Sequence, residues 1–224
     1  MTAIPLRREV YYPESDNTPM GETGVHVRES LYLLEAFDWQ LRDVPDVYVA
    51  ANMFLYYVEG DPRAVVAPDV FIAKGVPRGE RRIYKLWEEG QVPCLIVEVT
   101  SKSSRDDDVV KKKALYQQLG VEEYIVHDPL EEYLEPSLQG FRLVNGRYQP
   151  MPLEIRGAVR SQSIGVIFRK EGHGLRLVDT RTGETILPSQ EVRHAQRTAE
   201  ERASAADDEI ARLRAELDRL RSQG

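Results

Sequence analysis

The sequence is poor in cysteine and in long apolar runs, and both shortages limit what the protein can be. A single cysteine, Cys94, cannot form an internal disulfide framework, and a lone thiol suits a reducing compartment. No apolar run approaches the roughly 20 residues that span a bilayer, and the N-terminus lacks the apolar core of a signal peptide. These absences predict a soluble, cytoplasmic protein with no membrane segment.

Several catalytic signatures are also missing. The chain has no glycine-rich phosphate loop and no G-x-S-x-G element, and its four histidines show no zinc-binding spacing. Its net charge of −7 argues against a protein that coats nucleic acid non-specifically. An acidic chain can still be a nuclease, because a bound metal ion supplies local positive charge.

The composition divides the chain into three parts. We predict an extended arm over residues 1–20, a folded domain over 21–187 and one long helix over 188–224. In the last part apolar residues recur with heptad spacing, at Ala203, Ala206, Ile210, Leu213, Leu217 and Leu220. Flanking charges of opposite sign favour a coiled coil that forms a parallel homodimer. The alternative is a helix that packs on its own domain or stays solvated.

Two longer helices are expected in the folded domain, and a short one around 84–89. The first covers about 23–41, where Val27, Leu31, Leu34 and Leu41 fall near helical spacing. The second covers about 106–119 and ends at Gly120, a favourable helix stop.

Strands are expected around these helices. The segments 46–58 and 65–73 read as antiparallel neighbours, whereas 94–100 and 121–127 flank a helix and so predict a parallel crossover. Hairpins follow over 141–148, where Asn145-Gly146 predicts a tight turn, and over 164–187; both should widen the core sheet. The predicted fold class is α/β (α+β), a mixed sheet flanked by helices.

Two of these strands each carry one carboxylate, Asp69 and Glu98. Glu98 lies in a β-branched run that reads as a buried strand, where an ionised group is costly unless it is paired or bound to a metal. Two carboxylates on neighbouring strands can share one Mg²⁺ or Mn²⁺, and a nearby lysine can stabilise charge on a phosphate. Alternatively, acids at strand ends serve as caps, turn formers or salt-bridge partners.

A series of short motifs over about residues 11–187 resembles one family. They are Met20-Gly21-Glu22-Thr23 with His26, Asp46-Val47-Tyr48-Val49 with Asn52, Tyr56-Tyr57-Val58-Glu59-Gly60, Val66-Ala67-Pro68-Asp69-Val70-Phe71, Tyr84-Lys85-Leu86-Trp87-Glu88-Glu89-Gly90, Val97-Glu98-Val99-Thr100-Ser101-Lys102-Ser103-Ser104, Lys112, Leu115-Tyr116, Gly120-Val121, Glu123-Tyr124 and Asp128-Pro129. In this order they resemble the Uma-type restriction endonuclease family, a branch of the PD-(D/E)XK nuclease superfamily. The resemblance implies a restriction-endonuclease-like core and hydrolysis of a DNA phosphodiester bond.

The resemblance also implies the site residues. Asp69 and Glu98 would hold the metal, but the lysine expected two residues after Glu98 is replaced by Thr100. In this family the lysine is displaced onto the following helix, which makes Lys112 the match and leaves Lys102 as an alternative. Secondary candidates are His26, Glu29, Asn52, Asp108 and Tyr116. Asp108 lies four residues before Lys112, and a plain surface ion pair would equally explain that spacing.

Two functions therefore compete. The first is a metal-dependent DNA endonuclease. The second is a catalytically inactive nuclease fold that binds nucleic acid or serves as a dimeric protein-interaction module, which the threonine at position 100 and the acidic balance favour.

Overall fold

The structure is a computed structural model of the 224-residue chain, and it describes residues 10–15, 23–101, 107–189, 191–192, 197–200 and 202. The chain divides into two compact units, Met1–Ile186 and Leu187–Gly224. In the second unit residues 191–192 and 197–200 are helical, and the predicted heptad positions from Ala203 onward lie outside the described residues. No described helix combines the length and the apolar character that a bilayer-spanning segment requires.

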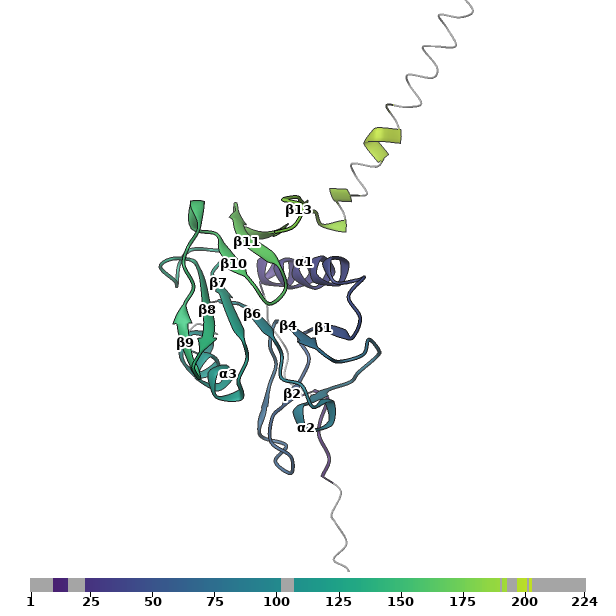
Figure 1. The fold of residues 1–224 in the computed structure, drawn as a ribbon, viewed down its shortest axis with the longest axis vertical. Helices are drawn as coiled ribbons and strands as arrows, with labels where there is room; N and C mark the ends of the chain where they lie inside the picture. Colours follow the sequence, from purple (N-terminus) through teal and green to yellow (C-terminus); the bar gives the residue numbers. More distant parts are fainter. Residues whose placement is uncertain are drawn as a thin grey trace, which may run out of the picture. The chain divides into compact units, whose positions relative to one another are not determined.

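A six-stranded mixed sheet forms the centre of the first unit (Figure 1). Its strand order is β1-β4-β6-β7-β8-β9. The strands are β1 (Val47–Ala51), β4 (Val70–Lys74), β6 (Leu95–Val99), β7 (Glu123–His127), β8 (Leu138–Val144) and β9 (Arg147–Pro150). All pairs are antiparallel except β6 with β7, so the predicted antiparallel and parallel neighbours are confirmed.

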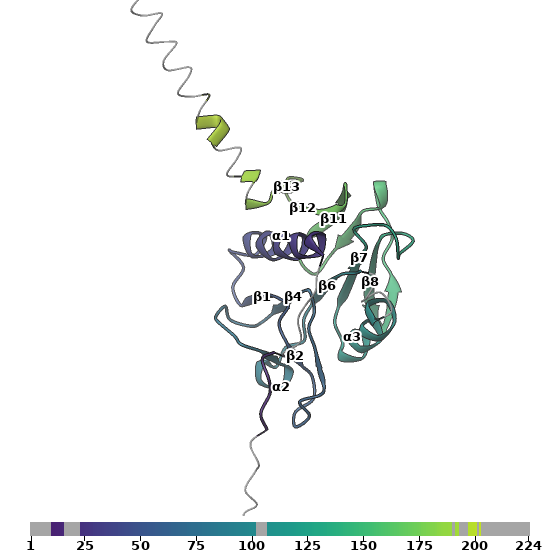
Figure 2. The ribbon, with the colours of Figure 1, turned by 180° about the vertical axis from the view of Figure 1, so that it is seen from behind.

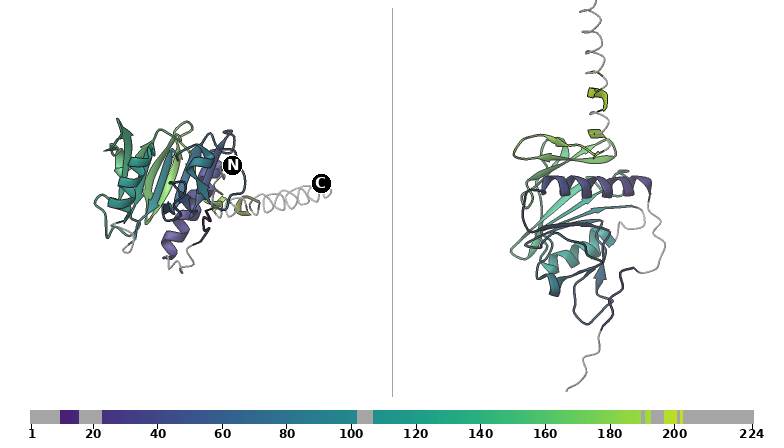
Figure 3. Two further views of the ribbon diagram at one scale, coloured as in Figure 1. Left: turned by 90° about the horizontal axis from the view of Figure 1, so that it is seen from below. Right: turned by 90° about the vertical axis from the view of Figure 1, so that its right-hand side faces the viewer.

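Helix α1 (Gly24–Gln40) covers one face of this sheet. It lies between the six-stranded sheet and a second sheet of order β10-β11-β12-β13, as the right-hand view of Figure 3 shows. The strands of the second sheet are β10 (Val159–Ser161), β11 (Val166–Glu171), β12 (Gly174–Asp179) and β13 (Thr185–Ile186). The short 3₁₀ turn η2 (Ile155–Gly157) precedes them. The expectation that the hairpin over 164–187 widens the core sheet was therefore wrong, because its strands pack on α1 as a separate layer. The expectation for 141–148 is confirmed, since β8 and β9 extend the six-stranded sheet.

The opposite face of the sheet is covered by the crossover between β6 and β7, seen from behind in Figure 2. The crossover begins with a π-helical turn, η1 (Asp107–Lys112), and continues as α3 (Lys113–Leu119). Gly120 ends α3 with a φ of 89°, a left-handed conformation that glycine adopts without steric cost. The apolar side chains of β6 therefore alternate between two cores, one under α1 and one under α3.

A third, small sheet of order β3-β2-β5 lies beyond β1 in the chain. Its strands are β2 (Leu55–Tyr56), β3 (Val65–Val66) and β5 (Tyr84–Lys85), and the short helix α2 (Leu86–Glu89) follows. The described part of the N-terminal arm contacts this region, since the Tyr12 ring lies 5.0 Å from that of Tyr56 and 5.2 Å from that of Trp87. Trp87 therefore packs against the ring of Tyr12.

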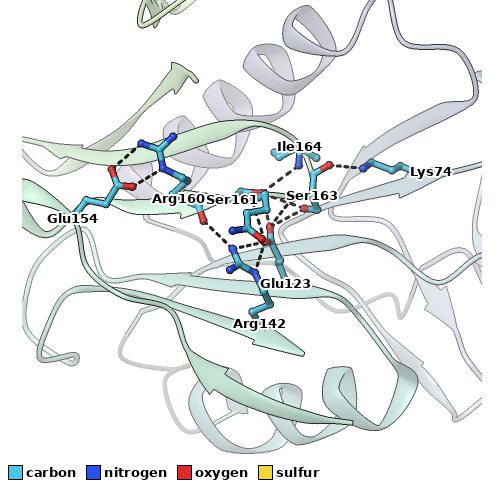
Figure 4. A network of polar contacts seen from close by, with 9 residues as sticks. Lys74, Glu123, Arg142, Glu154, Arg160, Ser161, Ser163 and Ile164 are labelled. Atoms are coloured by element: carbon cyan, nitrogen blue, oxygen red, sulfur yellow. Dashed lines mark hydrogen bonds and ion pairs between the residues drawn. The ribbon is translucent and has the colours of Figure 1, made fainter. Parts of the chain in front are cut away.

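A buried carboxylate ties the second sheet to the first (Figure 4). Glu123, at the start of β7, accepts hydrogen bonds from Arg142 Nε at 3.0 Å, Ser163 Oγ at 2.7 Å and Gln162 N at 3.0 Å, and also from Ser161 Oγ. Lys74 in turn donates to the Ser163 carbonyl. This network holds the turn before β11 against β7 and β8.

The apolar stripe predicted for α1 was partly wrong. Val27 and Leu31 are 44% and 55% exposed. The buried side of the helix instead carries polar residues among its apolar ones: His26, Glu29, Ser30, Tyr32, Leu33, Ala36 and Phe37. Polar side chains can take buried positions when strands elsewhere supply their hydrogen-bond partners, and β4 and β12 do so here.

Candidate active site

The site is built where β4 begins and β6 ends. Val70 pairs with Val97 in the antiparallel ladder, and continuing this register places Asp69 opposite Glu98. The Asp69 backbone N–H donates to Glu98 Oε2 at 3.3 Å, and the Val99 N–H donates to Asp69 Oδ2 at 2.7 Å. Each carboxylate is thus held by the backbone of the other strand, which fixes their separation without any long side chain.

The Glu98 carboxylate is fully buried and has further donors from the crossover. Tyr116 donates its hydroxyl to Oε1 at 2.7 Å, and Lys112 donates its ammonium to Oε2 at 2.9 Å. Position 116 lies four residues after position 112, so both side chains project from one side of the crossover towards β6. The displaced lysine therefore reaches the acid of β6 from the covering helix.

Asp108 is the third carboxylate of the cluster. Its Oδ1 lies 3.0 Å from Lys112 Nζ, and the residue is only 1% exposed. The reading of this pair as a plain surface ion pair was wrong, because the strand Glu123–His127 covers it: Tyr124 donates its hydroxyl to the Asp108 carbonyl at 2.9 Å.

His26 and Asn52 contact Asp69 from two other elements. His26 Nε2 on α1 lies 3.0 Å from Asp69 Oδ2, and both side chains are largely buried. Asn52, just after β1, donates its backbone N–H to the Asp69 and Pro68 carbonyls at 3.1 Å. Its φ of 49° is left-handed, which asparagine tolerates better than most residues. Asn52 thus fixes the backbone of Asp69, whereas His26 contacts its carboxylate.

Glu29 lies away from these contacts. Its Oε2 accepts the Leu175 N–H at 2.8 Å, and a Cβ on Gly174 would come within 2.4 Å of its Oε1. Burial raises the pKa of Glu29, and this one backbone donor and the charges of Arg176 and Arg28 oppose that rise. The structure therefore uses Glu29 to attach α1 to β12, and does not bring it to the pair Asp69 and Glu98.

Lys102 is outside the described residues. At the position where a lysine two residues after Glu98 would stand, Thr100 is buried and donates its N–H to the His127 carbonyl at 2.8 Å. The site residues that the structure brings together are Asp69, Glu98, Lys112, Asp108, Tyr116, His26 and the backbone of Asn52.

The electrostatics of the cluster are unbalanced. Burial raises the pKa of Glu98 to about 8; Lys112 opposes this rise, and Asp69 and Asp108 add to it. Burial alone would lower the pKa of Lys112, but the carboxylates of Glu98, Asp108 and Asp69 outweigh it and hold that pKa above its ordinary value. Three carboxylates thus surround one ammonium, a formal surplus of two negative charges when all are ionised.

This donor set fits a hard divalent cation. Carboxylate oxygens are the ligands that Mg²⁺ and Mn²⁺ prefer, and Mg²⁺ keeps several waters when one or two carboxylates bind it. Among the described residues no three His, Cys, Asp or Glu side chains are grouped to hold a metal ion, so a full protein cage is absent from this part of the chain. The residues present therefore fit a metal held by Asp69 and Glu98 with water completing its shell.

Sequence reasoning missed one buried ionisable group beside the site. His127, at the end of β7, pairs with Val99 across the parallel ladder and is completely buried. Neither ring nitrogen makes a well-aligned hydrogen bond within the described part of the chain. Burial lowers the pKa of His127 to about 4, and backbone groups of His173 and Ser137 oppose that fall. Strand alternation could have indicated that His127 is buried, because position 127 shares a face of the sheet with Ile125, which packs under α1.

Residues 14–167 match the model of the Uma2 family, whose description is "Putative restriction endonuclease". Among solved structures, a putative nuclease belonging to DUF820 from Anabaena variabilis is 16% identical with a TM-score of 0.49, over 65% of this chain and 76% of that chain. No curated protein matches the chain.

Proposed function

The chain belongs to the Uma2 family of putative restriction endonucleases, and we propose that it is a metal-dependent DNA endonuclease. The observation that supports this most is the buried pair Asp69 and Glu98. Glu98 Oε2 accepts hydrogen bonds from both the Asp69 N–H and the Lys112 ammonium. Two acids and a lysine at one strand end suit phosphodiester hydrolysis, which needs a divalent cation and a donor for the phosphate. The proposed domain is residues 21–187.

Each side chain has a role in this proposal. Asp69 and Glu98 would hold Mg²⁺ or Mn²⁺, which supplies charge stabilisation and makes water more acidic. Tyr116 and the Asp69 N–H fix the orientation of Glu98, and His26 and the Val99 N–H fix that of Asp69. Lys112 would donate to a non-bridging phosphate oxygen or orient the attacking water.

The inactive alternative has one observation in its favour. Lys112 already pairs with Glu98 and Asp108, so the ammonium offsets part of the charge that a cation would otherwise meet. A nuclease fold in which this pairing is permanent would bind nucleic acid or a partner protein without cutting it. Cleavage assays separate the two functions.

The test is cleavage of mixed DNA substrates by the purified protein with Mg²⁺, with Mn²⁺ and with chelator. We expect metal-dependent cutting that disappears in Asp69→Ala and Glu98→Ala, with both variants still folded by circular dichroism. Glu29→Gln is the matched control, because it changes a buried acid of α1 that contacts β12 instead of the site. Absence of cutting together with absence of Mn²⁺ binding would favour the inactive alternative.

A homodimer through residues 188–224 remains part of the proposal. Its support is the heptad spacing and the opposite charges that flank it in the sequence. Light scattering at micromolar concentration should give twice the chain mass of 25.6 kDa, and a monomer would contradict the dimer.

A further inference from the structure

Asp108 is a buried acid whose position the proposed reaction does not yet explain. It is 1% exposed and belongs to the π-helical turn that precedes α3. Lys112 Nζ lies 3.0 Å from its Oδ1, and neither carboxylate oxygen accepts a well-aligned hydrogen bond from any described residue. A buried carboxylate with so few partners is costly to retain, which suggests a role other than stability.

The two carboxylates that share Lys112 differ in what else holds them. Glu98 also receives the Tyr116 hydroxyl and the Asp69 N–H, so it keeps two donors if the ammonium leaves. Asp108 has no such donors in the described structure. Its backbone is anchored, because Tyr124 donates to its carbonyl at 2.9 Å. Among the described residues, Asp108 is thus a carboxylate on an anchored backbone whose close cationic partner is Lys112.

We propose that Asp108 is the positioning residue for Lys112. It keeps the ammonium beside the site when Glu98 turns its oxygen to a divalent cation. The inference rests on the proposed function, in which Glu98 binds that cation and Lys112 meets the phosphate. Lys112 reaches Glu98 from the crossover on a flexible four-carbon stem, and Asp108, four residues earlier on the same turn, gives its ammonium a second carboxylate contact.

The first test needs no metal and reads the ammonium directly. Acetylation of lysines in the folded protein, followed by mass spectrometry of the peptides, gives the labelling rate of Lys112. Because Asp108 holds the ammonium, Asp108→Asn should raise this rate about tenfold. The rise should exceed that in Glu98→Gln, and Asp108→Glu should restore a rate near that of the wild type. Lys113, whose ammonium lies 3.4 Å from the Phe141 ring centroid, is the internal control and should not change.

The second test is a double-mutant cycle read by Mn²⁺ calorimetry. With Lys112 present, Asp108→Asn leaves Glu98 as the carboxylate nearest the Lys112 ammonium. The ammonium then competes with Mn²⁺ for Glu98, so Mn²⁺ affinity should fall about tenfold. In the Lys112→Met background the same substitution should change Mn²⁺ affinity by less than about threefold. Equal changes on both backgrounds would show that Asp108 acts on the metal directly or through the fold, and would overturn the positioning role.

The outcomes distinguish this inference from the proposed function. If the wild type binds no Mn²⁺, the proposed function fails and the labelling experiment still decides the role of Asp108. If Mn²⁺ binds but Lys112 labels at the same rate in the wild type and in Asp108→Asn, the proposed function stands and the positioning role is wrong. Thermal melting of Asp108→Asn and Asp108→Glu confirms that both compared variants are folded.

Discussion

Glu98 and Glu123 are buried carboxylates on neighbouring strands of one sheet, yet their surroundings differ. Glu123 is surrounded by Arg142, two serine hydroxyls and two backbone N–H groups, so its donors match its acceptors (Figure 4). Glu98 lies opposite Asp69, and the ammonium of Lys112 contacts both Glu98 and Asp108. Acidic side chains therefore outnumber basic ones around Glu98. A carboxylate that stabilises the fold has its donors built in, whereas the crowding of acids around Glu98 is the basis of the proposed metal site.

The largest expected effect is on DNA cleavage, when the lysine beside Glu98 is replaced. Lys112→Met should lower DNA cleavage about a hundred- to a thousandfold, the usual cost of removing one donor to transition-state charge. Cleavage rates measured under saturating Mg²⁺ check this. Lys111→Met is the matched control, because Lys111 is an exposed neighbour of Lys112. Unchanged cleavage in Lys112→Met would move the role to Lys102 or remove it.

The next effect concerns stability. Glu123→Gln should destabilise the protein by about 3 kcal/mol, because an amide N–H₂ would face the donors that now surround a carboxylate. Glu98→Gln should change stability by less than about 1 kcal/mol at neutral pH, since a Glu98 carboxyl with a pKa of about 8 is largely protonated there and an amide replaces it without a change of charge. Urea unfolding of both variants measures the difference. Equal losses would mean that Glu98 is also a purely structural acid.

His127 extends the comparison to a third buried group, whose ring makes no well-aligned hydrogen bond in the described structure. Its pKa falls from 6.5 to about 4 on burial, so the unfolded chain binds its proton first as pH falls. Stability should therefore decrease by about 2 kcal/mol between pH 6.5 and pH 5. His127→Leu should remove this decrease in pH-dependent melting experiments, and an unaltered slope in that variant would assign the acid sensitivity to other groups.

Glu98 should show the opposite dependence. Its folded-state pKa of about 8 exceeds the unfolded value of 4.5, so the stability that it contributes is present below pH 4.5 and is lost as pH rises towards 8. Because a metal displaces its proton, Mn²⁺ affinity should increase by up to about tenfold per pH unit below pH 8 and level off above it. Calorimetry in buffers of different ionisation enthalpy should detect the released proton. A pH-independent affinity would show that Glu98 is already ionised without metal.

The sequence was sufficient for the parts of this site that depend on local pattern. β-branched runs located the strands of Asp69 and Glu98 and suggested that they are neighbours, but the antiparallel pairing of these two strands came only from the structure. The helical spacing of Asp108 and Lys112 was also visible. It could not show that the pair is buried, because the covering residue, Tyr124, comes from a strand beyond the helix.

Other features depend on contacts between distant segments. The partner of Glu29 is Leu175, 146 residues later in the chain, and no pattern near Glu29 indicates it. Val27 and Leu31 fitted an apolar stripe but face outward, because His26 and Glu29 take the buried side through bonds to β4 and β12. Glycine spacing predicted the last hairpins but not that they form a separate sheet over α1.

The most direct test of this account is Mn²⁺ calorimetry on the wild type, Glu98→Gln and Glu123→Gln at about pH 8, where Glu98 titrates. The account predicts that the wild type binds Mn²⁺, that Glu98→Gln loses at least about tenfold in affinity, and that folded Glu123→Gln keeps it. Equal affinity in all three proteins, or no binding to the wild type, would contradict the claim that the surplus charge around Glu98 holds a metal ion.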